Sequence, residues 1–316
     1  GTLKAGSSNA PFGSGAVTEN SSGGVVIDLN GKTISNALTL YSASSPTVYA
    51  LTDSAGSGVQ QTGTVTLGSN VLIGLGTGKT MTINGVIADT NGYVLTINKT
   101  GDTGTVIFGG ANTYTGATTV NAGTLRVTGS GTLGNTSSLL TISSATVDIQ
   151  NALTIGSLSM SGTSPAITNA SGTSSLVVNG TATVANSITT SGAQTYTGAV
   201  TLGAASSLTT GSSAGNILFS STVSGANTLS TTTTGDTTFT GAIGGTPLTG
   251  LTINTATLSA AAITLATNNA ISITNSSTGS ITGIIAGTGV TLTKAGAGDL
   301  TLGNSSSDST YSGGTT

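Results

Sequence analysis

The stretch MTINGVIADTNGYVLTINKTGDTGTVIFGGANTYTGATTVNAGTLRV, residues 81–127, decides the fold. Short apolar runs in it alternate with polar residues, and each is followed within a few residues by Gly or Asn. A period of two with this punctuation is typical of brief β-strands joined by turns. Helical periodicity does not survive a count over any window of a dozen residues, because Gly or Asn interrupts each candidate.

A second version of this stretch runs from residue 279 to residue 316 as GSITGIIAGTGVTLTKAGAGDLTLGNSSSDSTYSGGTT. The shared landmarks come in the same order: Gly85-Val86-Ile87 with Gly283-Ile284-Ile285, Lys99 and Gly101 with Lys294 and Gly296, and Thr113-Tyr114-Thr115-Gly116 with Thr310-Tyr311-Ser312-Gly313. A partial third echo is AQTYTGAVTLG, residues 193–203. Repetition of units made of short strands predicts a solenoid whose stacked coils share one core.

The rest of the chain keeps the same rhythm, with strands expected at Thr2–Lys4, Ala16–Thr18, Val25–Leu29 and Pro46–Leu51, and a turn at Asn30-Gly31. We therefore expect an all-β protein without significant helix. The predicted fold is a right-handed parallel β-solenoid (β-helix) that runs continuously over residues 1–316. Each coil should take roughly 20 to 25 residues, with Val, Ile and Leu inside and Thr, Ser and Asn outside.

The order of residues in VIADTNGYVLTINKTGDTGTVIFGGANTYTGATTVNAGTL, residues 86–125, resembles the passenger-associated repeats of bacterial autotransporter adhesins. The segment Gln194–Thr257 is similar to repeats of filamentous-haemagglutinin-type surface proteins. These resemblances imply right-handed β-helical passengers that are secreted to, or displayed on, the outer surface of a bacterium. They imply no catalytic residues. At Asn98–Gly104 the sequence NKTGDTG is longer than the family's K-x-G-x-G spacing, and we expect a bulged turn there.

The composition excludes several kinds of protein. Only 5% of the 316 residues are charged, and the six basic residues are scattered singly, so no basic stripe exists for nucleic acid. No cysteine is present, which rules out disulfides and cysteine-based metal sites. No apolar run is long enough for a transmembrane helix. The first residues lack the features of a signal peptide, and we expect the chain to be a segment of a longer repetitive protein.

The inventory of reactive side chains is equally sparse. The chain has no histidine and no cysteine, so the commonest general base and the thiolate nucleophile are both absent. The nearest approach to a catalytic cluster is Asp89 with Lys99 and Asp102, and Asp299 with Lys294 is its repeat. We expect these to be solvated turn charges, and we predict no catalytic, cofactor-binding or metal-binding residues. Calcium-binding patterns do not occur.

Three tyrosines, Tyr114, Tyr196 and Tyr311, occur in equivalent T-Y-[ST]-G contexts. We expect their rings to stack at coil corners with the hydroxyl reaching solvent. A role in binding a receptor is the alternative.

The predicted function is a non-catalytic structural fibre or adhesin stalk on a bacterial cell surface. The expected partners are the protein itself, by axial stacking of coils or as part of one long chain, and host or neighbouring-cell surface glycans. The chain ends on the first half of a repeat whose second half resembles its beginning, GTLK, which predicts a filament that continues head to tail.

Two alternatives stay open. One is a β-helical protein that binds or cleaves polysaccharide. The other is an ice-binding solenoid, which requires a flat face of T-x-T pairs on successive coils. The irregular spacing of Thr pairs in the sequence argues against the second alternative.

Overall fold

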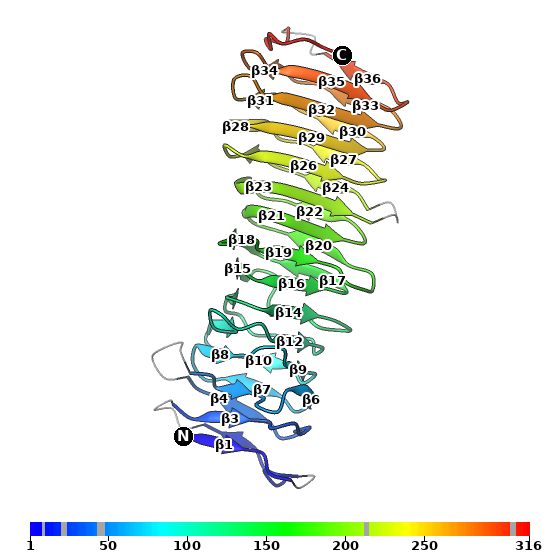
Figure 1. The fold of residues 1–316 in the computed structure, drawn as a ribbon. Helices are drawn as coiled ribbons and strands as arrows, with labels where there is room; N and C mark the ends of the chain where they lie inside the picture. The colour runs from blue at the N-terminus through cyan, green and yellow to red at the C-terminus, as the bar shows by residue number, and fades with distance from the viewer. Residues whose placement is uncertain (8–9, 20–23, 43–47, 212–214, 304–307) are drawn as a thin grey trace. The chain divides into compact units, whose positions relative to one another are not determined.

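The computed structural model describes residues 1–7, 10–19, 24–42, 48–211, 215–303 and 308–316, with only the backbone at 57–59. Over these residues the chain forms β-strands and no helix, and the paired strands run parallel (Figure 1). The predicted all-β, parallel β-solenoid is confirmed. The chain divides into two compact units, Gly1–Gly156 and Ser157–Thr316, which are described separately below. The handedness and the continuity over all 316 residues stay predictions.

The first unit stacks its strands in three columns. The first column holds β1, β3, β5, β8, β11, β13 and β15, and the second holds β6, β9, β12, β14 and β16. The third is the separate sheet β2–β4–β7–β10. The bounds are β1 Thr2–Lys4, β2 Val17–Thr18, β3 Val26–Asp28, β4 Leu38–Leu40, β5 Leu51–Thr52, β6 Ser57–Gln61, β7 Val65–Leu67, β8 Val71–Ile73, β9 Thr80–Ile83, β10 Ile87–Ala88, β11 Leu95–Ile97, β12 Thr105–Phe108, β13 Thr118–Val120, β14 Thr124–Val127, β15 Leu139–Ser143, β16 Thr146–Ile149 and β17 Ala152–Ile155.

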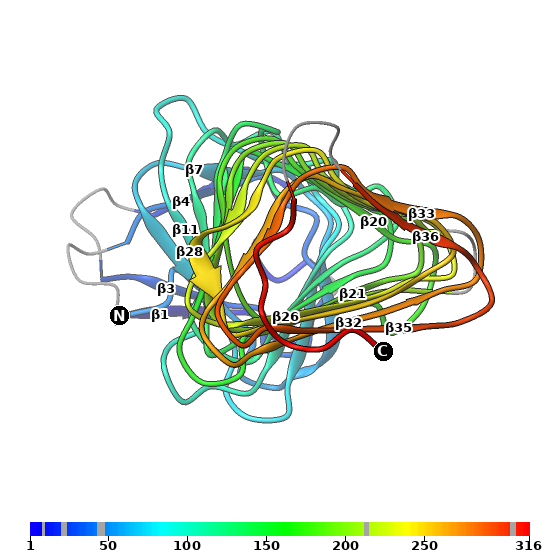
Figure 2. The same ribbon diagram turned by 90° about the horizontal axis from the view of Figure 1, so that it is seen from above.

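The second unit has the same plan, and its coils superimpose when they are viewed along the stack (Figure 2). One column holds β18, β25, β28, β31 and β34, another holds β19, β26, β29, β32 and β35, and the long strands β21 and β23 belong to both. The third column is β20–β22–β24–β27–β30–β33–β36. The bounds are β18 Ser157–Ser161, β19 Ala166–Thr168, β20 Ser175–Val178, β21 Ala182–Thr190, β22 Gln194–Tyr196, β23 Val200–Thr210, β24 Ile217–Phe219, β25 Val223–Ser224, β26 Thr228–Thr232, β27 Thr237–Phe239, β28 Ile243–Leu248, β29 Gly250–Thr255, β30 Leu258–Ala260, β31 Ile263–Leu265, β32 Ala270–Asn275, β33 Gly279–Ile281, β34 Ile285–Ala286, β35 Thr291–Ala295 and β36 Leu300–Leu302.

Inward side chains of successive coils lie in register and form the core. In the first unit Met81 pairs with Val106, Val106 with Leu125 and Leu125 with Val147, and all four are fully buried. Burying one such side chain contributes about 1.5–3 kcal/mol. The intervals are 25, 19 and 22 residues, as the residue numbers show. The columns therefore stay in register although the coils differ in length.

In the second unit a stack of rings fills part of the core. Tyr196, Phe219 and Phe239 occupy the same inward position in β22, β24 and β27. The ring centroids of Tyr196 and Phe219 are 5.2 Å apart, and those of Phe219 and Phe239 are 4.7 Å apart with nearly parallel planes. The interval from Leu176 to Gln194 in the same column is only 18 residues, which is shorter than the sequence led us to expect.

The local predictions for residues 1–31 agree with the structure within a residue, and the next one does not. The strands β1, β2 and β3 lie where they were expected. Asn30 and Gly31 both have positive φ, 46° and 76°, as the predicted Asn-Gly turn requires. The strand expected at Pro46–Leu51 is wrong over the residues that the structure describes: residues 46–47 lie outside them, residues 48–50 are not in a strand, and β5 begins only at Leu51. Within the described residues, no helix is both long and apolar enough to cross a membrane.

Candidate functional site

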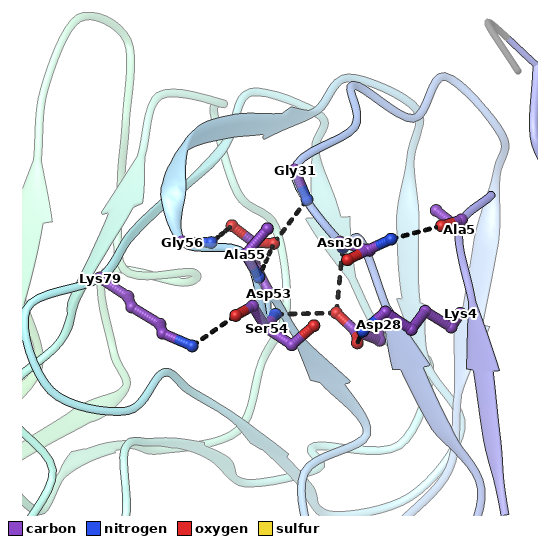
Figure 3. A network of polar contacts seen from close by, with 10 residues as sticks. All are labelled: Lys4, Ala5, Asp28, Asn30, Gly31, Asp53, Ser54, Ala55, Gly56 and Lys79. Carbon is purple, nitrogen blue, oxygen red and sulfur yellow. Dashed lines mark hydrogen bonds and ion pairs between the residues drawn. The ribbon is translucent and has the colours of Figure 1, made fainter. Parts of the chain in front are cut away.

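A polar network lies at a corner of the first unit, where strands β3 and β5 end (Figure 3). The Asp28 Oδ1 accepts the backbone N–H of Asn30 at 3.0 Å, which closes a local turn, and that of Ser54 in the next coil at 2.8 Å. In return, Asp53 Oδ1 accepts the N–H of Gly31 in the preceding coil at 2.8 Å. Each carboxylate thus holds its own turn and the neighbouring one.

The same Asp53 closes its own turn through Ala55 and Gly56, whose N–H groups lie 3.2 and 2.8 Å from its carboxylate oxygens. Figure 3 shows Lys79 reaching the carbonyl of Ser54 from the following coil, where its Nζ donates a hydrogen bond. The pairing of Asp28 with Asp53 was not predicted from the sequence. The sequence feature that could have indicated it is a repeated D-x-x-G motif, Asp28-Leu29-Asn30-Gly31 and Asp53-Ser54-Ala55-Gly56.

The electrostatics of this corner favour the ionised form of Asp28. Burial raises the pKa of Asp28, but the hydrogen bonds from Ser54 and Asn30 and the charge of Lys4 outweigh it, so the pKa lies below its ordinary value. The Lys4 Nζ is 3.6 Å from Asp28 Oδ2 and half exposed. Because the carboxylate oxygens already accept backbone N–H groups, the network stabilises the turns and offers little to a substrate.

The second polar cluster is built by the Asn98–Gly104 loop, where a bulged turn was predicted. Asn98 is fully buried with a φ of 58°. Its Nδ2 donates to the carbonyls of Gly104, at 2.9 Å, and Ala122, at 3.1 Å, and its Oδ1 accepts the N–H of Leu75 at 3.0 Å. One side chain therefore closes the longer loop and joins it to the coils before and after.

This loop also brings together two of the candidate catalytic residues. Asp102 Oδ2 accepts the N–H of Lys99 at 2.7 Å and the hydroxyl of Tyr49. The Lys99 Nζ lies 4.1 Å from the centroid of the Tyr49 ring, a cation–π contact. Burial, reinforced by the Asp102 carboxylate, raises the pKa of Tyr49. A tyrosine held protonated beneath a lysine is a poor general base, and the cluster instead fastens the loop.

The third candidate, Asp89, is engaged elsewhere. Its carboxylate accepts the N–H of Tyr93 at 2.7 Å and both the N–H, at 3.0 Å, and the hydroxyl, at 2.9 Å, of Thr115. The predicted repeat of the cluster is not assembled either, since Lys294 Nζ donates to the carbonyls of Ala295 and Gly296 at its own strand end.

The tyrosines of the T-Y-[ST]-G motif occupy matching positions in the first and last copies. The backbone N–H groups of Thr113 and Tyr114 both donate to the carbonyl of Ile87, at 2.8 and 3.3 Å. The corresponding N–H groups in the last copy donate to Ile285 at 2.9 and 3.3 Å. Each tyrosine hydroxyl bonds the Thr four residues later, Tyr114 with Thr118 at 2.6 Å and Tyr311 with Thr315 at 2.7 Å.

The glycine of the T-Y-[ST]-G motif is required for steric reasons. A Cβ at Gly116 would lie 2.0 Å from the carbonyl oxygen of Tyr93, and one at Gly313 would lie 2.2 Å from that of Val290. The chain passes so close to the preceding coil at this corner that only glycine fits.

The predicted solvent exposure of the tyrosine hydroxyls is wrong for two of the three. Tyr114 and Tyr196 are fully buried, because each hydroxyl has a partner inside the coil. The Tyr196 hydroxyl donates to Gln194 Oε1 at 3.0 Å, and its ring stacks as predicted. Burial raises the pKa of both hydroxyls. A receptor cannot reach these two rings, and only Tyr311 is partly exposed.

Two further carboxylates are buried. Asp148 on β16 pairs with Arg126 on β14 at 2.7 Å and accepts a hydrogen bond from Gln150 at 2.9 Å. Glu19 is 4% exposed, and burial raises its pKa to about 7, although the N–H of Tyr41, 2.6 Å from Oε2, acts in the opposite direction. Among the described residues no group of three or more acidic, His or Cys side chains is arranged to hold a metal ion.

Comparison with known families agrees with this geometry. The model of the family described as Passenger-associated-transport-repeat matches residues 97–127 and 292–316. Both matched segments contain the T-Y-[ST]-G corner, and the first contains the Asn98 loop. Together with the parallel β-solenoid, the two segments fit an autotransporter passenger repeat and hence an autotransporter passenger domain. Repeats of this family imply a secreted or cell-surface protein.

Searches of curated proteins and of solved structures gave no match to the chain. The similarity of residues 194–257 to filamentous-haemagglutinin-type repeats therefore stays a prediction.

Proposed function

We propose that the chain forms a non-catalytic structural part of a bacterial cell-surface fibre or adhesin stalk. The observation that carries the proposal is how its carboxylates are used. Asp28, Asp53, Asp89 and Asp102 each accept one or more backbone N–H groups of the turns, three of them from another coil or a more distant turn. Groups that could serve catalysis elsewhere are here committed to holding coils together.

The proposal includes assembly along the axis of stacking. In both matched repeats the residue four positions after the motif tyrosine pairs with a strand of the preceding coil, Thr118 with Leu95 and Thr315 with Leu292. A module that docks on the coil before it in the same way each time supports stacking of further coils, in one long chain or between copies. Glycans of host or neighbouring cells are the other proposed partners.

The proposal is tested in a bacterium that produces this chain. Antibodies against the chain should label intact cells, and deletion of the chain should reduce cell–cell or cell–surface adhesion. Absence of labelling on intact cells would contradict the localisation.

The non-catalytic part is tested separately with purified protein and a panel of polysaccharides. No cleavage is expected. Turnover that is lost in Asp89→Ala or Asp102→Ala, but kept in the matched surface variant Asp308→Ala, would show that the chain is an enzyme.

A further inference from the structure

One face of the second unit carries two rows of side chains that are mostly Ser and Thr, and we call it the hydroxyl face. It is the outer side of strands β21, β23, β26, β29, β32 and β35. The first row contains side chains paired coil to coil: Ser187, Ser207, Ser230, Thr252, Ser272 and Thr293. The second row, two residues further along each strand, contains Thr189, Thr209, Thr232, Asn254, Thr274 and Ala295, so the hydroxyl groups of this row are interrupted at β29 and end at β32.

This array corrects the expectation drawn from sequence spacing. Thr and Ser pairs fall 20 to 23 residues apart and look irregular in the sequence, but the turns absorb the differences in coil length. The pairing from β26 through β29 and β32 to β35 has no register shift. Four of the six coils therefore present a Ser-x-Thr pair in register, on β21, β23, β26 and β32, although none presents the T-x-T pair that the sequence analysis asked for.

The array is available to a partner. All members of both rows are partly or fully exposed. Within the described residues, none of their side chains makes a hydrogen bond to the protein. By contrast, Thr210, Thr233 and Thr255, at the ends of strands of the same column, are buried and bond carbonyl groups of the turns. The outward hydroxyls thus keep their full hydrogen-bonding capacity for what lies outside.

The strands of the hydroxyl face also contain almost no charged residues. Strands β21, β23, β26, β29 and β32 contain no Asp, Glu, Lys or Arg, and β35 contains only Lys294, whose Nζ is bonded to backbone carbonyls. The second unit as a whole carries four charged residues, Asp236, Lys294, Asp299 and Asp308, against eleven in the first. Soluble surfaces are ordinarily far richer in charge. A partner that fits this surface is itself uncharged and bonds through donors and acceptors.

The spacing of the side chains on the hydroxyl face limits which uncharged partner can fit it. Parallel strands are about 4.8 Å apart and side chains two residues apart along a strand are about 6.6 Å apart, so the hydroxyls form a nearly rectangular two-dimensional lattice. The backbone fixes this lattice before binding, and the Thr members, most of them in the second row, are β-branched and have few rotamers to lose. An extended crystalline surface of water molecules, with donors and acceptors repeating over similar distances, matches it.

We propose that the hydroxyl face of the second unit binds ice. Crystalline polysaccharide is the other uncharged, periodic surface, but sugar rings are usually bound by exposed aromatic rings. This face has none, and Tyr196, Phe219 and Phe239 of the same unit are buried. In the first unit the paired positions Arg126 and Asp148 of β14 and β16 form an ion pair with a buried carboxylate, so no equivalent array of hydroxyl groups continues there.

The test uses the full chain in an ice-recrystallisation assay, with incorporation into a growing ice hemisphere as a second readout. The wild type should inhibit recrystallisation and enter the ice. The paired substitution Ser230→Lys with Thr252→Lys, which places two charges in the centre of the first row, should lower both activities several-fold. Ser230→Thr, which keeps a hydroxyl, should retain them.

The matched control is Thr238→Lys with Ser259→Lys. These two residues are also paired on adjacent coils and point outward, but from the sheet of β27 and β30. Circular dichroism and thermal melting establish that each variant is folded. The proposal is overturned if the folded wild type is inactive towards ice, if the control pair loses as much activity as the face pair, or if the face binds crystalline cellulose or chitin but not ice.

Discussion

Asp28 and Asp53 exchange hydrogen bonds across two successive coils: Asp28 accepts the N–H of Ser54 and Asp53 accepts the N–H of Gly31, both at 2.8 Å. The relationship is reciprocal, so removal of either carboxylate leaves a backbone N–H in the other residue's turn without its acceptor. A hydrogen bond to a charged group contributes about 1.5–3 kcal/mol.

The Asp53→Ala variant should lower the free energy of unfolding by about 1–3 kcal/mol, because the N–H groups of Gly31 and Gly56 lose their acceptor. Urea denaturation measures the change. The exposed Asp308→Ala is the control and should change stability little. In a double-mutant cycle with Asp28→Ala the two losses should not add, since the residues share one network. Additive losses would contradict the reciprocal arrangement.

Stability should depend on pH through Glu19. The folded pKa of about 7 lies above the ordinary 4.5, so the contribution of this group is fully present below pH 4.5 and is lost as the pH rises through 7. Glu19→Gln removes the cost of ionising a buried carboxyl, so it should be more stable than the wild type at pH 8 and similar to it at pH 4. Chemical denaturation at both pH values measures this, and an equal difference at the two would contradict it.

Asn98 combines a left-handed backbone with three side-chain hydrogen bonds, and two variants separate these roles. Asn98→Gly keeps the backbone conformation and should lose about 1–3 kcal/mol from the unpaired buried groups. Asn98→Ala should lose about 1–2 kcal/mol more, because an L-residue with positive φ is strained. Thermal or urea unfolding provides the comparison. Equal stability of the two variants would show that the backbone conformation adds nothing.

Removal of one of the stacked rings in the second unit should leave a cavity and lower the free energy of unfolding. Phe219 lies between Tyr196 and Phe239 and is fully buried, so Phe219→Ala should destabilise by about 3–5 kcal/mol. Phe219→Leu should cost much less. The outward neighbour Leu218→Ala is the control, since it leaves the stack intact. A loss at Leu218 as large as that at Phe219 would argue against the stack as the source.

Much of the fold follows from the sequence, because strand formation is local. The alternation of apolar and polar residues predicted β1 and β3, and the Asn30-Gly31 pair predicted the turn that follows β3. The repeat of Thr113–Gly116 at Thr310–Gly313 reappears as two copies of one corner with the same backbone hydrogen bonds.

What could not be predicted depends on register. Whether Ser230 faces Thr252 is decided by how many residues each turn absorbs, and that number varies from coil to coil. For the same reason Asp89 was grouped with Lys99 and Asp102 from their nearness in sequence, whereas the turn places it beside Thr115. The burial of the Tyr114 hydroxyl needed the knowledge that Thr118 lies within reach.

The unequal coil lengths make the corners of this chain natural places for added sequence. Strands of three or four residues hold the register while the Asn98–Gly104 loop accommodates a longer connection, closed by one asparagine. The backbone at Gly101 has open space around it, with no atom near the position of a Cβ. A foreign peptide inserted after Thr100 should therefore be presented to solvent while the coils on either side of it stay paired. The chain is in this sense a scaffold for peptide display.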